Sequence, residues 1–302
     1  VQIGELTGLA IAKNYIKPFG TIFLNLLKFV VVPIVLFSIA SGVIIALGLM
    51  LAVLYAGRRS KEFGLKEDDI LDGVLWVTPF AILCARAYYC AFAWEQYARN
   101  PISVLYIWNG GIAIYGGVIG AVVGVAVFCR IKRIKIAAML DMLMLGFLIG
   151  QALGRWGNFF NREAFGAETD SFLRMGLTNV VTGETRYFHP TFLYESLWNI
   201  IGFALLHFYS KKRKFDGEMT LGYLAWYGFG RMIIEGLRTD SLYFFGLSFL
   251  GQPIRVSQMI AVVTCVVAGS VLVWMMAKHK QRGELFVDKV AMQASKKEEE
   301  QE

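Results

Sequence analysis

Residues 137–166 read AAMLDMLMLGFLIGQALGRWGNFFNREAFG, an apolar run that turns abruptly polar. The first part, 137–154, approaches the roughly 20 residues that an α-helix needs to cross a bilayer. The second part, GRWGNFFNREAFG, adds five strongly polar side chains: Arg155, Asn158, Asn161, Arg162 and Glu163. Charged side chains within hydrocarbon are costly, so they normally face an aqueous cavity or a partner. The stretch therefore predicts a membrane-spanning helix that ends in a polar site.

The composition of the whole chain is that of a membrane protein. Of its 302 residues, 56% are hydrophobic and 18% are charged, and the mean hydropathy is +0.53. Soluble domains are about 25% charged. The net charge of +7 comes from short basic clusters between apolar runs, a placement that sets membrane orientation. We therefore expect a membrane-embedded protein with no nucleic-acid partner.

Seven apolar segments follow one another, at roughly 37–57, 71–92, 111–130, 137–154, 190–209, 217–235 and 256–277. Basic clusters follow every second segment: GRRSKEFGLK, RIKRIK, KKRK and KHKQR. The positive-inside rule places these clusters in the cytoplasm, the N-terminus outside and the C-terminus inside. The expected fold class is an all-α, polytopic membrane protein with seven transmembrane helices. Its most polar connection, 155–189, is expected to form a small periplasmic or extracellular head.

The two ends of the chain depart from this plan. Residues 1–36 fit poorly, because the apolar stretch from Thr21 to Gly57 is too long for one span and Pro33 could divide it. Either an interfacial piece precedes the first span, or an additional span puts the N-terminus inside. Residues 281–302 are expected to form a charged, disordered tail. The cysteines and histidines show no metal-ligand spacing, so neither a metal nor another cofactor is expected.

Three other apolar segments also contain charged groups. Arg86 lies in ILCARAYY, Glu195 and Asn199 lie one helical turn apart in HPTFLYESLWN, and Arg231, Glu235 and Arg238 follow at similar intervals in GFGRMIIEGLR. In WNGGIAIYGG, four glycines surround Tyr115.

Each of these features has a structural explanation. Arg231 and Glu235 could form an interfacial ion pair, Arg86 could snorkel to a headgroup, and Tyr115 could belong to an aromatic belt. Taken together, they indicate one cavity that opens to the outer leaflet. Several arginines facing a cavity indicate an anionic ligand, and a membrane supplies phosphate in its phospholipid headgroups.

The polar stretches also resemble the sequence blocks of one family. GRWGNFFNREAFG is similar to the signature G-R-x-G-N-F-x-N-x-E, with a glycine nearby, of the prolipoprotein diacylglyceryl transferases. WNGGIAIYGGVIG, HPTFLYES, YGFGRMIIEGLR and RVSQ resemble further blocks of that family, and the resemblance covers 44–280. It implies a seven-helix enzyme of the bacterial plasma membrane. Such an enzyme moves the diacylglyceryl group of phosphatidylglycerol to the lipobox cysteine thiol of a prolipoprotein signal peptide and releases glycerol phosphate.

The resemblance implies roles for individual residues. The expected catalytic residues are Arg155, Arg231, Tyr115 and Glu235. The residues expected to bind phosphatidylglycerol are Arg155, Asn158, Glu163, Gly166, Arg86, Arg238 and His189.

The general base stays open, because Tyr115 stands where many family members have a histidine. A phenol is a poor base at neutral pH. Three alternatives follow: a Tyr115 phenolate, His189, or no dedicated base, since phosphate stabilisation could let a substrate thiolate react unaided.

The beginning of the chain departs from the family pattern. Members usually have W-Y-G before IALG, where this sequence has Ala40, Ser41 and Gly42. Upstream, YIKPFGTIFLNLLKFVVVPIVLFSIASGV resembles an early helix of the dicarboxylate/amino-acid:cation symporters. The expected organisation is therefore an atypical segment at 1–43, a transferase domain at 44–280 and the tail at 281–302. Two alternatives remain: an inactive lipid-binding relative, disabled by its first residues, and a cation-coupled symporter.

Overall fold

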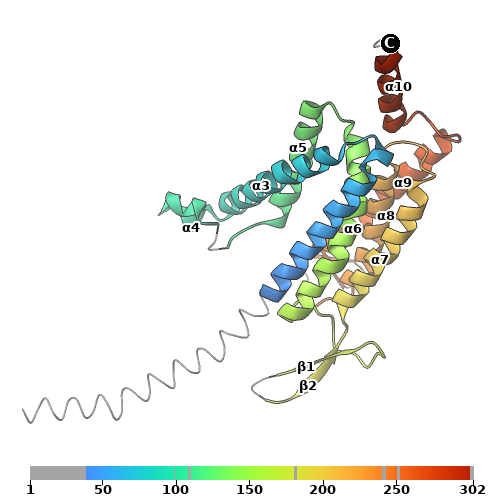
Figure 1. The fold of residues 1–302 in the computed structure, drawn as a ribbon. Coiled ribbons are helices and arrows are strands. Elements are labelled where there is room, and N and C mark those ends of the chain that lie inside the picture. Colours follow the sequence, from blue (N-terminus) through green and yellow to red (C-terminus); the bar gives the residue numbers. More distant parts are fainter. Residues whose placement is uncertain are drawn as a thin grey trace, which may run out of the picture.

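The computed structural model describes residues 39–98, 100–107, 110–179, 182–239, 243–249 and 252–299, and this part is mostly helical (Figure 1). Its first helix is Ile39–Phe63, which ends in the 3-10 turn η2 (Ser60–Phe63). The later helices are α3 (Glu67–Phe92), α4 (Trp94–Tyr97), η3 (Pro101–Leu105), α5 (Ile114–Lys132), α6 (Ile136–Asn161), α7 (Thr191–Ser210), α8 (Glu218–Glu235), α9 (Val256–Lys278) and α10 (Phe286–Glu299). The expectations for residues 1–38, a symporter-like start and a possible extra span, lie outside the described residues.

Each of the seven apolar segments coincides with a long helix. Five of these helices are long and apolar enough to cross a membrane, namely Ile39–Phe63, α3, α5, α6 and α9. The other two, α7 and α8, have 20 and 18 residues but are less apolar, because they carry buried polar side chains such as Glu195 and Glu235. The protein is thus a multi-pass membrane protein, with five evident spans among its described residues.

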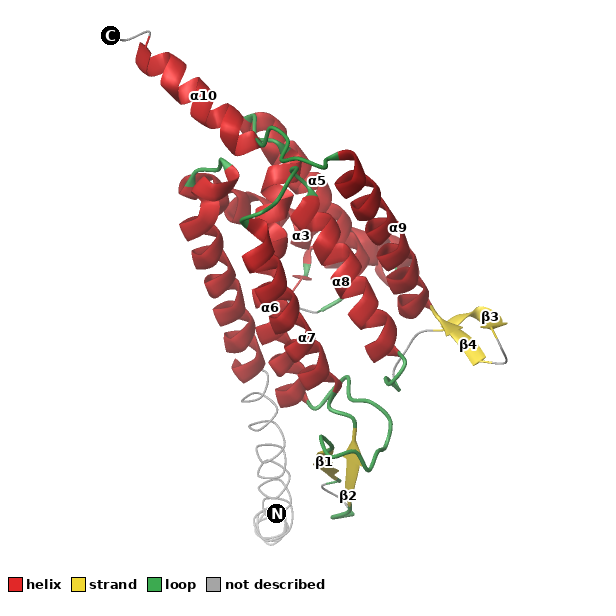
Figure 2. Cartoon of the chain, turned by 90° about the vertical axis from the view of Figure 1, so that its right-hand side faces the viewer, coloured by secondary structure: helices red, strands yellow, loops and turns green. Residues whose placement is uncertain are grey.

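The long helices form two groups. Helix Ile39–Phe63 lies side by side with α6 and α7, and α8 and α9 complete this bundle (Figures 1 and 2). Helices α3 and α5 pack closely on each other and form a separate pair that diverges from the bundle (Figure 1). Most residues of α3 and α5 therefore have other neighbours than the residues inside the bundle.

Glycines hold the neighbouring helices close. A Cβ added at Gly116 of α5 would lie 2.4 Å from the Tyr88 Cβ of α3, and one at Gly120 would lie 2.5 Å from the Cys84 Cβ. In α6, a Cβ at Gly146 would meet the Ala52 carbonyl oxygen of the first helix at 3.3 Å. Small residues at such spacings allow close backbone approach, which drives helix association in lipid.

Helices α7 and α8 are joined by a reciprocal pair of tryptophans. The Trp198 indole N–H donates to the Trp226 carbonyl, and the Trp226 indole donates to the Trp198 carbonyl, both at 3.0 Å. The two rings stack with centroids 4.2 Å apart. This contact fixes the register of α7 against α8, and with it the relative height of their polar residues.

Within the tail that was predicted to be disordered (281–302), the described residues Phe286–Glu299 form the helix α10. Asp216, in the turn between α7 and α8, accepts a hydrogen bond from the Phe286 amide at 2.9 Å and pairs with Lys135 at 2.9 Å. The buried Leu285 and the half-buried Phe286 add apolar contacts at this end of the bundle. These two large apolar residues, where the helix begins, were the signal for docking.

The expectation of an all-α fold is also too simple, since two β-hairpins occur in the connections. Strands β1 (Met175–Thr178) and β2 (Thr185–Phe188) pair antiparallel from Met175↔Phe188 to Thr178↔Thr185. They lie within the predicted head, beyond one end of the bundle (Figure 1). Strands β3 (Tyr243–Phe249) and β4 (Gln252–Arg255) pair before α9. Such short strands carry too little periodicity to be separated from loops by sequence.

Candidate functional site

Glu195 joins the two arginines that the sequence singled out. Its Oε2 lies 2.6 Å from Arg155 Nε of α6, and its Oε1 lies 2.7 Å from Arg231 Nη1 of α8. Arg231 Nη2 also pairs with Glu235 Oε2 at 2.6 Å, one turn further along α8. The side chain of Glu195 is 6% exposed and that of Glu235 2% exposed, whereas both arginines are partly accessible. The structure thus brings Arg155, Arg231 and Glu235 together through a fourth residue.

Glu235 is held from the start of α9 as well. The Ser257 hydroxyl donates to Glu235 Oε1 at 2.6 Å, and a guanidinium nitrogen of Arg255 donates to the Glu235 carbonyl oxygen. Buried carboxylates are stable only when they are paired and hydrogen-bonded. We call the five residues Arg155, Glu195, Arg231, Glu235 and Arg255 the arginine cluster.

The arginine cluster carries an excess of positive charge, since it contains three guanidinium groups and two carboxylates, and Arg255 donates to a backbone carbonyl. Arg155 uses its Nε toward Glu195, and no hydrogen bond to another described residue uses its two Nη groups. A guanidinium held from one side presents its remaining N–H groups in the fork geometry that suits phosphate. The cluster can therefore bind an anionic, phosphate-like group with donors that are already oriented.

Asn199 lies one turn after Glu195 and is only 1% exposed. Neither atom of its side-chain amide has a hydrogen-bond partner among the described residues. It borders a cavity of about 10 Å³, together with Glu195 and Arg231, and such a space holds about one water molecule. The cluster therefore extends one turn deeper along α7, through a polar pocket the size of a water.

The glycine of the signature joins the ends of three helices. The Gly166 amide donates to the His189 carbonyl at 2.9 Å, and the Ala167 amide donates to the Leu237 carbonyl at 2.9 Å. Gly166 also forms a β-bridge with Arg238. A Cβ at this position would lie 2.7 Å from the His189 Cβ and 2.9 Å from the Leu237 carbonyl oxygen. Only glycine fits this position, and it brings His189 and Arg238 to the same end of the bundle as Arg155.

The other signature residues lie at the end of α6. Asn158 is half-buried, one turn beyond Arg155, and its carbonyl accepts the Glu163 amide at 3.0 Å. Arg162 ends the helix in the left-handed conformation, with φ 53°. Glu163 is exposed and accepts a hydrogen bond from Asn161 at 3.1 Å. Asn158 and Glu163 thus lie near the cluster along the chain, but among the described residues no hydrogen bond or ion pair joins their side chains to its arginines.

Arg86 is placed differently from the other arginines. A guanidinium has five N–H donors, and all five are used by backbone carbonyls, those of Ser103, Val104, Tyr106, Gly110 and Gly111. Arg86 is buried and also lies over the Tyr97 ring, 5.2 Å from its centroid. It therefore fixes the connection between α3 and α5, and snorkelling does not describe it.

Tyr115, at the start of α5, is half-exposed. Within the described part of the chain, no hydrogen bond or ion pair links Tyr115 or Arg86 to Arg155 or Arg231. The polar groups that the structure joins thus come from α6, α7, α8 and residues 255–257. A place for Tyr115 and Arg86 in one cavity with them stays a prediction.

Sequence reasoning left two residues of the cluster, Glu195 and Arg255, out of its list of site residues, together with Ser257, which donates to Glu235. The signal for Glu195 was present, because it is an acidic residue inside an apolar helix. Its two partners could not be identified, since they belong to helices far apart in sequence. Arg255 and Ser257 appeared only as part of the RVSQ block.

The bundle and the arginine cluster define a class: a multi-pass membrane protein with arginines and buried glutamates paired among its helices. The family model of the prolipoprotein diacylglyceryl transferases matches residues 29–275. The chain therefore belongs to this family. The match begins within the segment 1–43 that the sequence set apart, ahead of the first described helix.

Curated relatives agree over most of their length. The phosphatidylglycerol–prolipoprotein diacylglyceryl transferase of Lactiplantibacillus plantarum is 43% identical over 246 residues, covering 77% of this chain and 83% of the relative. The enzyme of the same name from Enterococcus faecalis is 45% identical over 75% of this chain and 82% of its own. The enzyme of the same name from Listeria monocytogenes is 40% identical over 78% of this chain and 85% of its own.

Proposed function

We propose that this protein transfers the diacylglyceryl group of phosphatidylglycerol to the cysteine thiol of a prolipoprotein lipobox and releases glycerol phosphate. Family membership and the names of the relatives support the reaction. Within the structure, the proposal depends on one observation, the bridging of Arg155 and Arg231 by Glu195. Two oriented guanidinium groups inside a membrane protein suit the phosphate of an anionic lipid.

The reaction is a substitution at carbon. The cysteine thiolate attacks the glycerol carbon that carries the phosphate ester, and a carbon–sulfur bond forms. The carbon–oxygen bond breaks, and its electron pair stays on the phosphate oxygen of the leaving glycerol phosphate. Negative charge therefore grows on the phosphate as the reaction proceeds, and preorganised cations stabilise such charge. Arg155 and Arg231 supply this stabilisation, while Glu235 orients Arg231.

The residues around the cluster complete the headgroup site in this proposal. Asn158 hydrogen-bonds the headgroup, Gly166 and Glu163 shape the turn above it, and Arg238 and His189 line its outer edge. Arg86 acts on the site only through the backbone carbonyls of residues 103, 104, 106, 110 and 111, which it holds.

No dedicated base is needed for this mechanism. Tyr115 is half-exposed on α5, and His189 Nδ1 lies 3.2 Å from the Tyr194 hydroxyl. The thiol proton passes to solvent, because the nucleophile is the thiolate and the arginines lower the barrier on the side of the leaving group. A substrate carrying a cysteine of lowered pKa would then react faster at neutral pH.

The membrane arrangement belongs to the same proposal. Helices α7 and α8 cross the membrane with the five evident spans, which gives seven spans in the plasma membrane of a bacterium. The four basic connections lie at the end of the bundle that carries α10, opposite the hairpins (Figures 1 and 2). By the positive-inside rule the end with α10 is cytoplasmic, and the hairpins with the outer half of the site face outward.

The test is lipidation of a lipobox peptide by the purified protein in phosphatidylglycerol-containing micelles. Peptide mass should rise by one diacylglyceryl group, in step with glycerol phosphate release. Lack of both products, under conditions where the Enterococcus faecalis relative is active, contradicts the proposal.

A second candidate, an inactive lipid-binding relative, is favoured by the environment of Ser41. Ser41 is buried, and a Cβ at Gly157, two residues after Arg155, would lie 3.5 Å from the Ser41 Cβ. The position where family members carry a tyrosine thus faces the signature helix. If that ring supports the site, Ser41→Tyr should raise kcat; an unchanged kcat means that the ring is dispensable in this protein.

A further inference from the structure

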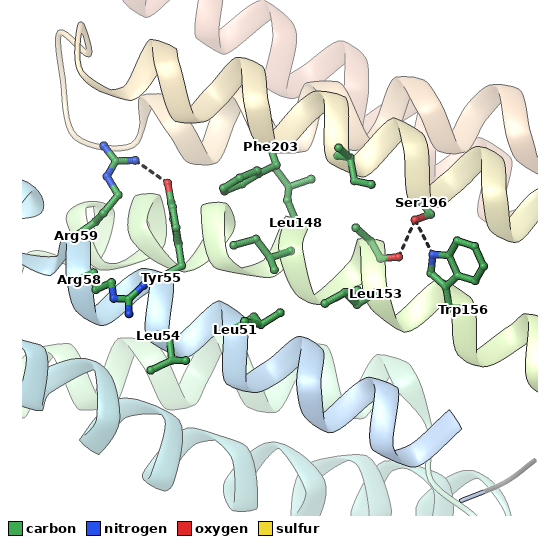
Figure 3. Close-up of a pocket in the computed structure, with 13 residues that line it drawn as sticks. Leu51, Leu54, Tyr55, Arg58, Arg59, Leu148, Leu153, Trp156, Ser196 and Phe203 are labelled. Atoms are coloured by element: carbon green, nitrogen blue, oxygen red, sulfur yellow. Dashed lines mark hydrogen bonds between the residues drawn. The ribbon is translucent and has the colours of Figure 1, made fainter. Parts of the chain in front are cut away.

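A long groove lies between helix Ile39–Phe63, α6 and α7, with a volume of about 550 Å³ (Figure 3). Its walls are almost wholly apolar along the middle, where Leu51, Leu54, Leu148, Leu153 and Phe203 line it (Figure 3). A groove with such walls inside a membrane protein suits a hydrocarbon chain.

One end of the groove adjoins the arginine cluster. Trp156 and Ser196 line this end and are joined by a hydrogen bond of 3.2 Å (Figure 3). Trp156 follows Arg155 in α6, and Ser196 follows Glu195 in α7. A lipid whose phosphate lies on the cluster therefore has the mouth of an apolar groove one residue away on each of two helices.

The other end is closed by hydrogen-bonded polar groups. The Tyr55 hydroxyl lies 2.7 Å from His207 Nδ1, and Arg59 Nη1 lies 2.6 Å from the same hydroxyl. Arg59 Nη2 also donates to the Ser210 hydroxyl at 3.0 Å. A methyl group pushed into this inner polar cluster (Tyr55, Arg59, His207 and Ser210) would break these bonds without replacing them, which is unfavourable in a buried site.

The length of the groove suits one acyl chain. Ser196 lines one end, and His207 lies behind the other end, where it bonds to the lining residue Tyr55. These two residues are 207 − 196 = 11 residues apart on α7, which corresponds to roughly 16 Å at about 1.5 Å per residue. Half of the ~30 Å hydrocarbon core is about 15 Å.

We propose that the groove holds one acyl chain of the phospholipid whose phosphate lies on the arginine cluster, and that the inner polar cluster limits the length of this chain. The inference rests on the proposed function for the headgroup site and adds a determinant of acyl-chain specificity. Inside a bilayer the chain gains no hydrophobic free energy by entering the groove. The groove therefore contributes selectivity through close packing: a short chain leaves voids, and a long one meets the polar cluster.

Photo-crosslinking tests occupancy without turnover. Phosphatidylglycerol with a diazirine at the end of one acyl chain is added to the purified protein without peptide acceptor, and labelled residues are mapped by mass spectrometry. The terminal diazirine should label Leu54, Tyr55 and Phe203, whereas a diazirine next to the ester should label Leu153 and Trp156. Labelling confined to residues outside the groove, such as Ile201, overturns the proposal.

Two adjacent isoleucines of α7 provide a matched pair of variants. Ile200 lines the groove and Ile201 does not, yet they are 50% and 49% exposed. Ile200→Trp should lower kcat/KM for long-chain relative to short-chain phosphatidylglycerol by at least about fivefold, the low end of what overpacking costs. Ile201→Trp should leave this ratio unchanged. Equal ratios in the two variants overturn the proposal.

The two measurements separate this inference from the proposed function. Groove labelling in a protein that lipidates no peptide supports the groove and contradicts the transferase activity. Normal lipidation with no labelling in the groove supports the transferase activity and overturns the proposal of an acyl chain in the groove. The same holds for normal lipidation in which Ile200→Trp leaves the ratio of kcat/KM for long and short chains unchanged.

Discussion

Arg155 is bound to the fold through Nε and directs its two terminal nitrogens elsewhere. Lysine at this position keeps a positive charge beside Glu195 but has no planar fork, so it cannot hold phosphate through two parallel bonds. Arg155→Lys should therefore reduce kcat/KM by about 10²- to 10³-fold, the usual effect of losing one preorganised donor to developing charge. Steady-state lipidation of a lipobox peptide measures it. The exposed Arg162 gives a control with the same substitution, and near-normal activity of Arg155→Lys would show that two-point phosphate binding at this residue is wrong.

Substitution of Glu195 should have a different effect, because its carboxylate positions two arginines at once. Removing one partner from a buried ion pair costs about 3–5 kcal/mol, so Glu195→Gln should lower both the thermal stability and the activity. Arg155→Lys, in contrast, should lower activity with little change in the unfolding temperature. Differential scanning fluorimetry in detergent, run beside the lipidation assay, distinguishes the two. Glu168→Gln is the control, since Glu168 pairs with Arg186 at 3.2 Å on the exposed head and such pairs contribute little. Unchanged stability of Glu195→Gln would contradict its bridging role.

For single residues, the sequence predicted a side-chain contact where the two partners lie one turn apart in the same helix. The ion pair of Arg231 with Glu235 follows from their spacing in one helix, and the structure confirms it. The link from Glu195 to Arg155 depends on the packing of α6 against α7, which no local pattern encodes. The partners of Arg86 could not be predicted either, because its acceptors are backbone carbonyls, which carry no sequence signal.

Glycines determine how closely the helices α3 and α5 approach. Gly116 and Gly117 are neighbours in α5, but a Cβ at Gly116 would lie 2.4 Å from the Tyr88 Cβ, whereas one at Gly117 would be 3.6 Å from the Ala85 Cβ. Gly116→Ala should thus separate α3 from α5 and destabilise the protein by about 1–3 kcal/mol. Gly117→Ala should be neutral or slightly stabilising, because alanine favours the helix. The unfolding temperatures of the two variants measure the difference, and equal values would refute close packing at Gly116.

The long helices were predictable as elements, since each apolar run of spanning length became one helix. The hairpins and α10 were missed because their structure comes from a few contacts outside the element. Helix α10 is a charged segment that is ordered by the Asp216 hydrogen bond to its first amide and by the contacts of Leu285. Composition alone made it look disordered.

For the whole molecule, orientation in the membrane decides from which side the substrates reach the arginine cluster. Phosphatidylglycerol and a lipobox cysteine can meet at the cluster only if the end of the bundle with Gly166 and the β1–β2 hairpin faces outward. The basic connections at the opposite end predict this arrangement by the positive-inside rule. The cysteines at 84, 90, 129 and 265 lie within helices, so a cysteine-free background can be made for labelling.

In that background, Thr182→Cys in the hairpin turn should react with a membrane-impermeant maleimide in intact spheroplasts. Lys212→Cys, in the turn between α7 and α8, should react only after lysis. Both positions are exposed, so a difference in labelling reports sidedness and not burial. Glu284→Cys, before α10, should behave as Lys212→Cys does, since an odd number of spans separates each from the hairpin. Labelling of Lys212→Cys in intact cells would invert the topology and place the arginine cluster on the cytoplasmic side, where the thiol of an exported prolipoprotein could not reach it.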